Sequence, residues 1–175
     1  MRILAISDIT AKYYFDYYTP GKLDSFDLIL ACGDLHQEYL EFLVTMSNKP
    51  VFYVHGNHDE GYDQAPPGGC TCIDDMIYVY QGVRILGLGG SYRYRDGKYM
   101  YTEAQMRRRI RRLWFQLRKY GGFDILVTHA PARHINDFDN LSHRGFDCFA
   151  TAYPQSYLTF GCPAGMLLLY AELTP

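Results

Sequence analysis

Residues 50–59 read Pro50-Val-Phe-Tyr-Val-His-Gly-Asn-His-Asp59, and this stretch decides how the rest of the chain is interpreted. Its β-branched and aromatic run, Val51 to Val54, predicts a buried strand that stops at a glycine followed by three polar residues. The polar residues therefore lie at the C-terminal end of a strand, the edge where open α/β sheets bind ligands. A simple turn would look the same, so the interpretation depends on whether other strands bring partners to this edge.

Other apolar runs end in polar residues in the same way, and each is predicted to be a strand. They are Arg2–Ser7 before Asp8, Asp27–Cys32 before Gly33-Asp34, Phe123–Thr128 before His129, and Tyr157–Phe160 before Gly161-Cys162-Pro163-Ala164. Between two of them, residues 38–47 have the apolar spacing of a helix. Strand, helix and strand in succession are typical of parallel α/β layers.

The middle of the chain predicts a hairpin and a helix. Met76–Tyr80 and Val83–Leu88 flank a Gln-Gly turn, and Gly61–Cys72 is rich in glycine and proline and predicts a loop. The glycines of Gly87-Leu-Gly-Gly-Ser91 either let a phosphate approach the backbone or simply shape the turn. A capping box at Thr102-Glu-Ala-Gln105 begins one helix, which continues to Tyr120 and ends at two glycines.

Composition limits the possible classes of protein. A chain of 175 residues predicts a single domain, residues 1–175. The 17 Lys and Arg residues nearly balance the 19 Asp and Glu residues, which gives no general attraction to nucleic acid or anionic membranes. No apolar run approaches the roughly 20 residues of a membrane span, and the N-terminus lacks the pattern of a signal peptide. The 5 cysteines suggest no disulfide framework, so we expect a cytoplasmic protein with reduced thiols and no membrane partner.

The predicted helix carries seven basic residues, which leave two interpretations open. A basic stripe can bind nucleic acid, but basic residues opposite an intact apolar face more often form a solvated outer surface. We expect the solvated surface. The residues are Arg107, Arg108, Arg109, Arg111, Arg112, Arg118 and Lys119.

The side chains at the strand ends form a set of oxygen and nitrogen donors. They are Asp8, Asp34, Asn57 with His58, His129 and, more weakly, Cys162. Carboxylate, amide and imidazole ligands suit Mn²⁺, Fe or Zn²⁺, bound as one or two ions. Two metals about 3.5–4 Å apart can neutralise a phosphoester and activate a water molecule for its hydrolysis. An imidazole that is not a ligand could then protonate the leaving group.

In order and context, these residues resemble the motif series of the calcineurin-like metallophosphoesterases. The resemblance runs from Met1 to about Tyr157 and is most specific at Gly56-Asn57-His58-Asp59. The stretches Gly89-Gly90-Ser91 with Arg93-Tyr94, and His143-Arg144-Gly145-Phe146, resemble a branch of small bacterial phosphoesterases. The resemblance implies a four-layer α/β sandwich, in which two mixed β-sheets are flanked by helices.

The resemblance also implies a role for each matched residue. Asp34 would bridge two metals, Asp8 would bind the first, and Asn57 and His129 would bind the second. His58 would stand near the leaving group without binding metal.

Two family motifs are degenerate in this chain. The first is usually Asp-x-His, but position 10 is Thr10. The closing motif, Gly-His-x-His, would fall at residues 161–164, where Cys162 could bind metal as a thiolate and Ala164 cannot bind it. Similar proteins continue with further strands, and the sequence leaves open whether the C-terminus is divergent, truncated or frame-shifted.

These observations predict a metal-dependent hydrolase that cleaves a phosphomonoester or phosphodiester, with a phosphorylated small molecule or nucleotide as substrate. The first alternative is a weakened phosphoesterase-like domain that binds one metal or a phosphorylated ligand without efficient turnover. The second is a nucleic-acid binder that uses the arginines of the predicted helix. The motifs favour the hydrolase.

Several other residues carry an open choice between function and structure. His36 and His55 flank motifs without matching them, so a supporting role is expected. His134 and His143 follow His129 in a polar segment, where either substrate contact or plain exposure is possible. Four tyrosines could stack on a nucleobase, but helical packing against the core is the expectation; they are Tyr13, Tyr14, Tyr17 and Tyr18.

Overall fold

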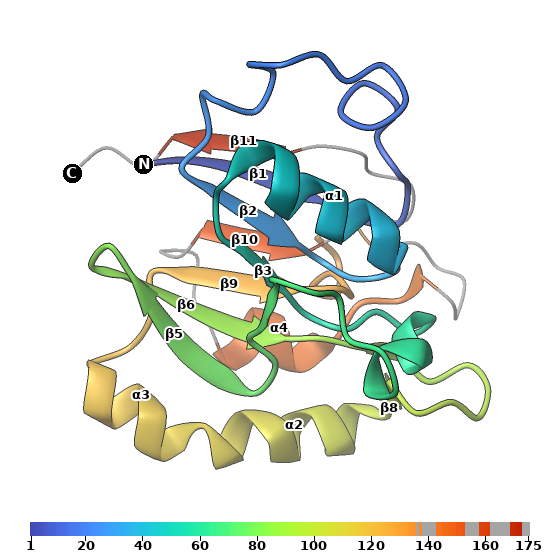
Figure 1. Cartoon of the computed structure of the whole chain (residues 1–175). Coiled ribbons are helices and arrows are strands. Elements are labelled where there is room, and N and C mark those ends of the chain that lie inside the picture. The colour runs from blue at the N-terminus through green and yellow to red at the C-terminus, as the bar shows by residue number, and fades with distance from the viewer. Residues whose placement is uncertain (136, 138–142, 153–157, 162–168, 173–175) are drawn as a thin grey trace.

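The computed structural model describes residues 1–135, 137, 143–152, 158–161 and 169–172. Two mixed β-sheets form its centre, and helices lie on their outer sides (Figure 1). The helices are α1 (Gln37–Ser47), α2 (Glu103–Arg112), α3 (Trp114–Tyr120) and α4 (Asp147–Ala152), and the 3₁₀ helix η1 spans Asp59–Asp63.

The first sheet has the strand order β11-β1-β2-β3-β4, with bounds β1 (Arg2–Ile6), β2 (Leu28–Ala31), β3 (Val51–Tyr53), β4 (Thr71–Cys72) and β11 (Leu169–Glu172). The strands β1, β2, β3 and β4 run parallel, and β11 pairs antiparallel with β1. The parallel strands bring the ends of β1, β2 and β3 to one edge. The three strands predicted there are confirmed, whereas the predicted loop Gly61–Cys72 was wrong in part, because it contains β4 and part of η1.

The second sheet has the order β10-β9-β6-β5, with bounds β5 (Met76–Tyr80), β6 (Val83–Leu88), β9 (Ile125–Thr128) and β10 (Leu158–Gly161). The predicted hairpin is confirmed as the antiparallel pair β5 and β6, and β9 runs parallel to β6 and β10. A two-stranded ladder joins β7 (Ser91–Tyr92) to β8 (Met100–Tyr101). The end of β9 thus faces the same side of the molecule as the ends of the first sheet (Figure 1).

Buried apolar side chains form three clusters that follow the pleat of the strands. Successive side chains of β1 point to opposite faces of the sheet and so belong to different clusters. Leu4 packs with α1, whereas Ile3 packs with Ile85 and Ile125 of the second sheet. A third cluster joins the second sheet to α2 through Leu86 and Met106. The strands are therefore apolar on both faces, as expected of sheets covered on both sides.

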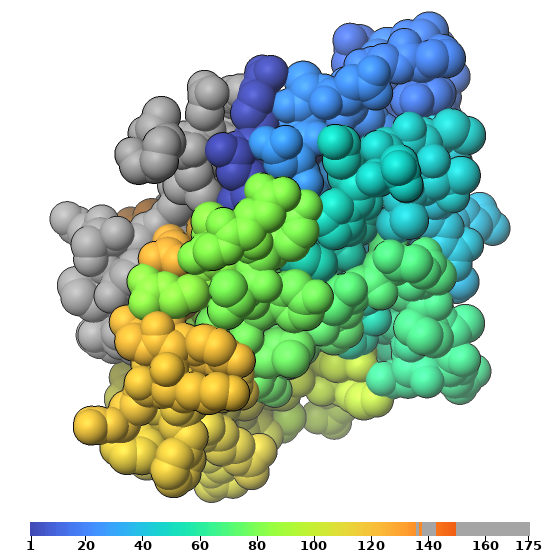
Figure 2. All heavy atoms as spheres, turned by 60° about the vertical axis from the view of Figure 1, so that its left-hand side comes forward, coloured from blue at the N-terminus to red at the C-terminus, as the bar shows by residue number. Residues whose placement is uncertain are grey.

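The helix predicted as one continuous element is broken into two at Leu113. The capping box at Thr102 and the end at Gly121 are confirmed, but α2 stops at Arg112 and α3 starts at Trp114. The break has a tertiary cause, because the Gln116 side chain accepts a hydrogen bond from the Ile77 N–H at 2.8 Å and donates one to the Asp75 carbonyl at 3.2 Å. These bonds dock α3 on β5, beside the hairpin in the space-filling view (Figure 2).

One of the seven basic residues contradicts the predicted solvated surface. Arg109 is only 8% exposed, whereas the other six are exposed. Its guanidinium lies 2.9 Å from a carboxylate oxygen of Asp75 and donates at 2.6 Å to the Gly89 carbonyl. This carboxylate partner draws Arg109 to the inner face of α2, which periodicity alone could not show.

The tyrosine-rich segment forms turns instead of the expected helix. Tyr14 is buried and packs edge-on against Phe26, with ring centroids 6.2 Å apart. Tyr13 and Tyr17 are 56% and 67% exposed. Pro20-Gly21 follows, and a proline disfavours the helical conformation in the residue before it, so the segment ends in a turn. Among the described residues, no helix combines the length and apolar character needed to cross a membrane.

Candidate active site

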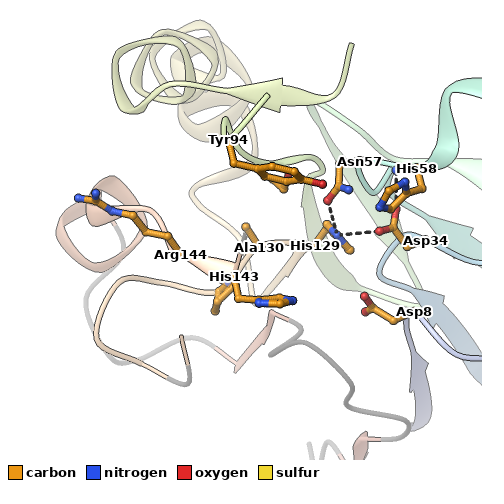
Figure 3. A pocket seen from close by; sticks show the side chains of 11 residues that line it. Asp8, Asp34, Asn57, His58, Tyr94, His129, Ala130, His143 and Arg144 are labelled. Atoms are coloured by element: carbon orange, nitrogen blue, oxygen red, sulfur yellow. Dashed lines mark hydrogen bonds and ion pairs between the residues drawn. The ribbon is translucent and has the colours of Figure 1, made fainter. Parts of the chain in front are cut away.

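The loops that follow β1, β2, β3 and β9 meet in one pocket of about 300 Å³ (Figure 3). The structure brings together every described residue of the predicted site. The pocket is lined by Asp8, Asp34, Asn57, His58, Ser91, Tyr94, His129, Ala130, Pro131, His143 and Arg144. Residues far apart in the sequence thus face one solvent-accessible space.

Two glycines allow the central loops to touch. A side-chain carbon at Gly33 would lie 2.4 Å from the Gly56 nitrogen, and one at Gly56 would lie 2.1 Å from an Asp34 carboxylate oxygen. Gly33 also has φ +95°, a conformation that favours glycine. These contacts explain why glycine precedes both Asp34 and Asn57, because any larger residue would push the two loops apart.

The buried Asp59 side chain links the same two loops through hydrogen bonds. It is 4% exposed, and its Oδ2 accepts hydrogen bonds from the Asp34 N–H at 2.8 Å and the Gly56 N–H at 2.7 Å. Burial raises the pKa of this carboxyl against the lowering effect of the two N–H donors. The last residue of Gly56-Asn57-His58-Asp59 therefore positions the loops, and it does not line the pocket.

His129 is the buried centre of the site. Its Nδ1 lies 2.9 Å from the Cys32 carbonyl, which can only accept, so Nδ1 carries a hydrogen. Its Nε2 faces the Asn57 Oδ1 at 3.3 Å and the Asp34 Oδ2 at 3.4 Å. Burial disfavours the charged ring, but the hydrogen bond and negative charge of Asp34 outweigh it and raise the pKa of His129 to about 9.

Asp34 is held in place from two sides. Its Oδ1 accepts the backbone N–H of His58 at 2.8 Å, and its Oδ2 faces His129. Burial would raise the pKa of Asp34, but the hydrogen bonds from His129 and His58 lower it overall. The carboxylate is thus ionised in the pocket, with its two oxygens directed to different neighbours.

Asp8 lies on the opposite side of the pocket from Asn57 (Figure 3). Its φ of 58° is unusual for a residue with a side chain, and its N–H donates to the Gly33 carbonyl at 3.1 Å. The Ser7 hydroxyl donates to one Asp8 carboxylate oxygen at 2.6 Å. Asp8 therefore lines the pocket from the end of β1, with its carboxylate oriented by Ser7.

The donor atoms fit a divalent cation. Asp8 and Asp34 each offer a carboxylate oxygen, and His129 offers an imidazole nitrogen. These three atoms lie within 4.8 Å of one another. Nδ1 of His129 carries a hydrogen, so in a neutral ring Nε2 has only a lone pair. That lone pair faces the Asp34 and Asn57 oxygens. The arrangement is repulsive unless a proton or a cation lies between the nitrogen and the oxygens. Oxygen and imidazole ligands suit Mn²⁺, Fe or Zn²⁺.

His58 has a different environment from the three donors. Its side chain is exposed and its Nδ1 lies 3.5 Å from the Arg95 guanidinium. Because a guanidinium can only donate, Nδ1 accepts and the hydrogen of the neutral ring sits on Nε2. Arg95 was not anticipated from the sequence, since only its neighbours Arg93 and Tyr94 fell in a recognised stretch.

The remaining sequence predictions separate into pocket and non-pocket residues. His143 lines the pocket and its ring points towards Asp8, whereas the Arg144 guanidinium points away (Figure 3). Thr10, His36, His55 and His134 do not line it. Cys162 and Ala164 lie outside the described residues. Ser91 and Tyr94 also line the pocket. They lie in a stretch that the sequence analysis singled out, but it assigned them no role in the site.

Comparison with known proteins agrees with the motifs. The sequence model of the calcineurin-like phosphoesterase family matches residues 1–154. No curated protein matches the chain. Among solved structures, a protein of unknown function from Aquifex aeolicus is similar, with 17% identity and a TM-score of 0.45 over 91% of this chain and 88% of that chain. Because the family match covers most of the sequence, the chain belongs to the calcineurin-like phosphoesterase family.

Proposed function

We propose that this chain is a metal-dependent hydrolase that cleaves a phosphomonoester or phosphodiester, with a phosphorylated small molecule or nucleotide as substrate. The observation that carries the proposal is the convergence of the Asp34 and Asn57 oxygens on Nε2 of His129 at the floor of an open pocket. The proposal includes the four-layer sandwich, which the three apolar clusters support.

The proposed ligands fall into two groups, one for each cation. Asp8 and Asp34 would hold the first cation. Asp34, Asn57 and His129 would hold the second, with Cys162 as a further ligand of that cation. When bound, the cations would neutralise the negative charge of the phosphate and lower the pKa of a water molecule towards neutral pH. Mn²⁺, Fe and Zn²⁺ all fit these donors.

His58 would protonate the leaving group. The ring would act in its protonated form, because a neutral imidazole is too weak an acid to give up its remaining hydrogen, and its exposure lets it take up the proton from solvent.

A specific observation favours a second candidate, a domain that binds one metal or a phosphorylated ligand without efficient turnover. The Asp8 side of the pocket lacks the expected imidazole at position 10, because Thr10 stands there and does not line the pocket. Only Asp8 and Asp34 then serve the first cation among the residues we describe. A single cation would hold phosphate but would activate water less effectively.

One experiment separates the two candidates. The chain is assayed with Mn²⁺ on a nitrophenyl phosphodiester and a nitrophenyl monoester, and its metal content is counted by elemental analysis. Asp34→Asn and His58→Ala test the site, and Asp16→Asn, an exposed carboxylate outside the pocket, is the matched control. Turnover lost in both site variants and retained in the control supports the hydrolase. Phosphate binding with no turnover by the unchanged protein supports the second candidate.

A further inference from the structure

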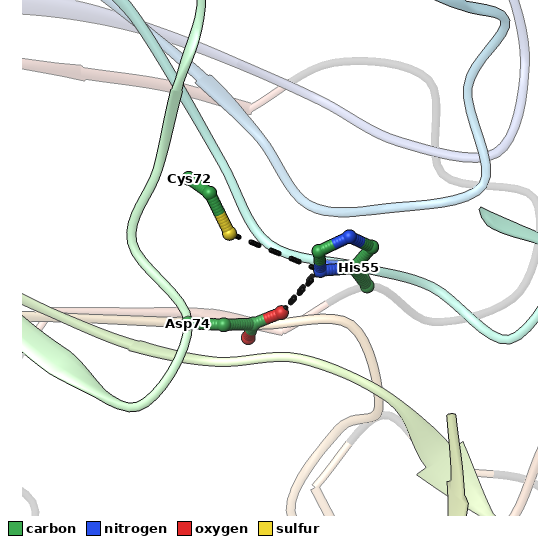
Figure 4. Close-up of side chains that lie close together, drawn as sticks. All are labelled: His55, Cys72 and Asp74. Carbon is green, nitrogen blue, oxygen red and sulfur yellow. Dashed lines mark hydrogen bonds and ion pairs between the residues drawn. The ribbon is translucent and has the colours of Figure 1, made fainter. Parts of the chain in front are cut away.

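A second group of potential metal ligands lies outside the active-site pocket. His55 follows β3, Cys72 ends β4, and Asp74 follows shortly after (Figure 4). The Nδ1 of His55 is 2.6 Å from the Asp74 Oδ2 and 3.9 Å from the Cys72 Sγ, and all three ligand atoms lie within 4.8 Å of one another. None of the three residues lines the pocket.

The backbone and a neighbouring ring hold this group in place. The Asp74 carboxylate accepts the N–H of His55 at 3.0 Å and that of Gly89 at 2.5 Å, and Arg109 lies 3.7 Å away. The His55 ring stacks on Tyr99, with centroids 4.3 Å apart and planes at 13°. These contacts orient Nδ1 towards the other two ligand atoms, as the partners around metal-binding histidines do.

A single hydrogen on Nδ1 cannot bond to both of its neighbours at once. Nδ1 carries at most one hydrogen, but both the Asp74 carboxylate and the Cys72 sulfur face it. Sulfur, nitrogen and oxygen together form a ligand set typical of zinc, whose bonds of about 2.0–2.3 Å place tetrahedral ligands roughly 3.3–3.6 Å apart. The observed separations of 2.6 and 3.9 Å bracket that range, so small side-chain shifts would create the geometry.

We propose that Cys72, His55 and Asp74 form a zinc-binding site that is separate from the active site. The fourth position is left to water, because the His55 and Asp74 side chains are 12% and 16% exposed and the ion can enter from solvent. The bound ion would link the end of β3 to the start of the second sheet, directly behind Gly56-Asn57-His58-Asp59. The proposal does not depend on hydrolytic activity.

Cobalt provides a direct test, because a thiolate bound to Co²⁺ gives a charge-transfer absorption in the near ultraviolet that oxygen and nitrogen ligands do not give. The full chain, stripped of metal, is titrated with Co²⁺. Cys72→Ser removes the proposed thiolate. Cys70→Ser is the matched control, since Cys70 lies two residues earlier and outside the group. Cys162→Ser tests the cysteine considered for the active site, and circular dichroism checks that each variant folds.

We expect the absorption in the unchanged protein, in Cys70→Ser and in Cys162→Ser, and its loss in Cys72→Ser. Added Zn²⁺ should displace Co²⁺ and remove the band. Asp34→Asn should keep the band even though it loses hydrolysis, which separates this proposal from the proposed function. Absence of the band in the unchanged protein would show that the group is only an ion pair. Retention in a folded Cys72→Ser, or loss in Cys162→Ser, would also overturn the proposal.

Discussion

The two sides of the active-site pocket differ in how firmly they hold their ligand atoms. On one side, Asn57 and His129 are 7% exposed each, and three hydrogen-bonded loops fix them around Asp34. On the other side, Asp8 is supported by Ser7, and Thr10 replaces the histidine of the family motif. The difference indicates that a cation would bind first and most tightly on the Asn57 side. Each prediction below tests that asymmetry.

The largest effect is expected for Asp34→Asn, because Asp34 serves both sides of the pocket. Loss of its negative charge should reduce hydrolysis by about 10³-fold or more, equivalent to about 4 kcal/mol, and should lower the bound metal per chain. Rates and metal content are measured side by side, with Asp16→Asn as control. Unchanged turnover in Asp34→Asn would place the reaction elsewhere in the molecule.

His58→Ala should reduce the turnover number by about 10²-fold while metal content stays unchanged, because we propose that His58 donates a proton without binding metal. The loss should be smaller for a nitrophenyl ester, whose leaving group needs little protonation, than for an alkyl ester. His36→Gln, outside the pocket, is the control. Equal losses on both esters, or a loss of metal, would argue against this role.

Metal affinity should rise with pH. The folded-state pKa of His129 is about 9, above the ordinary value of 6.5, so a proton competes with the cation at neutral pH. Affinity should increase about tenfold per pH unit from pH 6.5 to 9 and then level off. In metal-free protein, the His129–Asp34 pair contributes stability that is fully present below pH 6.5 and is lost as pH rises through about 9. Calorimetric Mn²⁺ titrations check the slope, and a flat profile would contradict it.

The smallest effect is expected for Thr10→His, which restores the family ligand on the weaker side. Thr10→His alone should raise metal occupancy on the Asp8 side and leave the Asn57 side unchanged, and total occupancy should rise further when positions 162 and 164 also carry histidine. Elemental analysis at limiting Mn²⁺ measures the gain. No gain in occupancy with all three histidines would show that the closing motif has been misplaced.

Much of the candidate site could be predicted because strand ends carry their own local pattern. Val51 to Val54 reads as a strand whatever its neighbours are, and parallel pairing then brings the residues after it to the edge that also holds Asp8 and Asp34. The capping box at Thr102 is equally local. Such features need no knowledge of the packed structure.

The features that could not be predicted depend on contacts between distant segments. The break at Leu113 follows from Gln116 bonding to β5, and the burial of Arg109 follows from carboxylates on the β4–β5 connection. The Arg95 contact with His58 joins residues 37 positions apart. The His55, Cys72 and Asp74 group likewise exists only once the two sheets meet.

The most direct test of the asymmetric site is the rate of phosphodiester hydrolysis by metal-stripped protein during a titration with Mn²⁺. The structure predicts that turnover appears as the tighter site fills, grows further as the weaker site fills, and is absent throughout in Asp34→Asn. Binding of Mn²⁺ to the same protein with no turnover at any concentration would contradict the hydrolase and leave a ligand-binding domain.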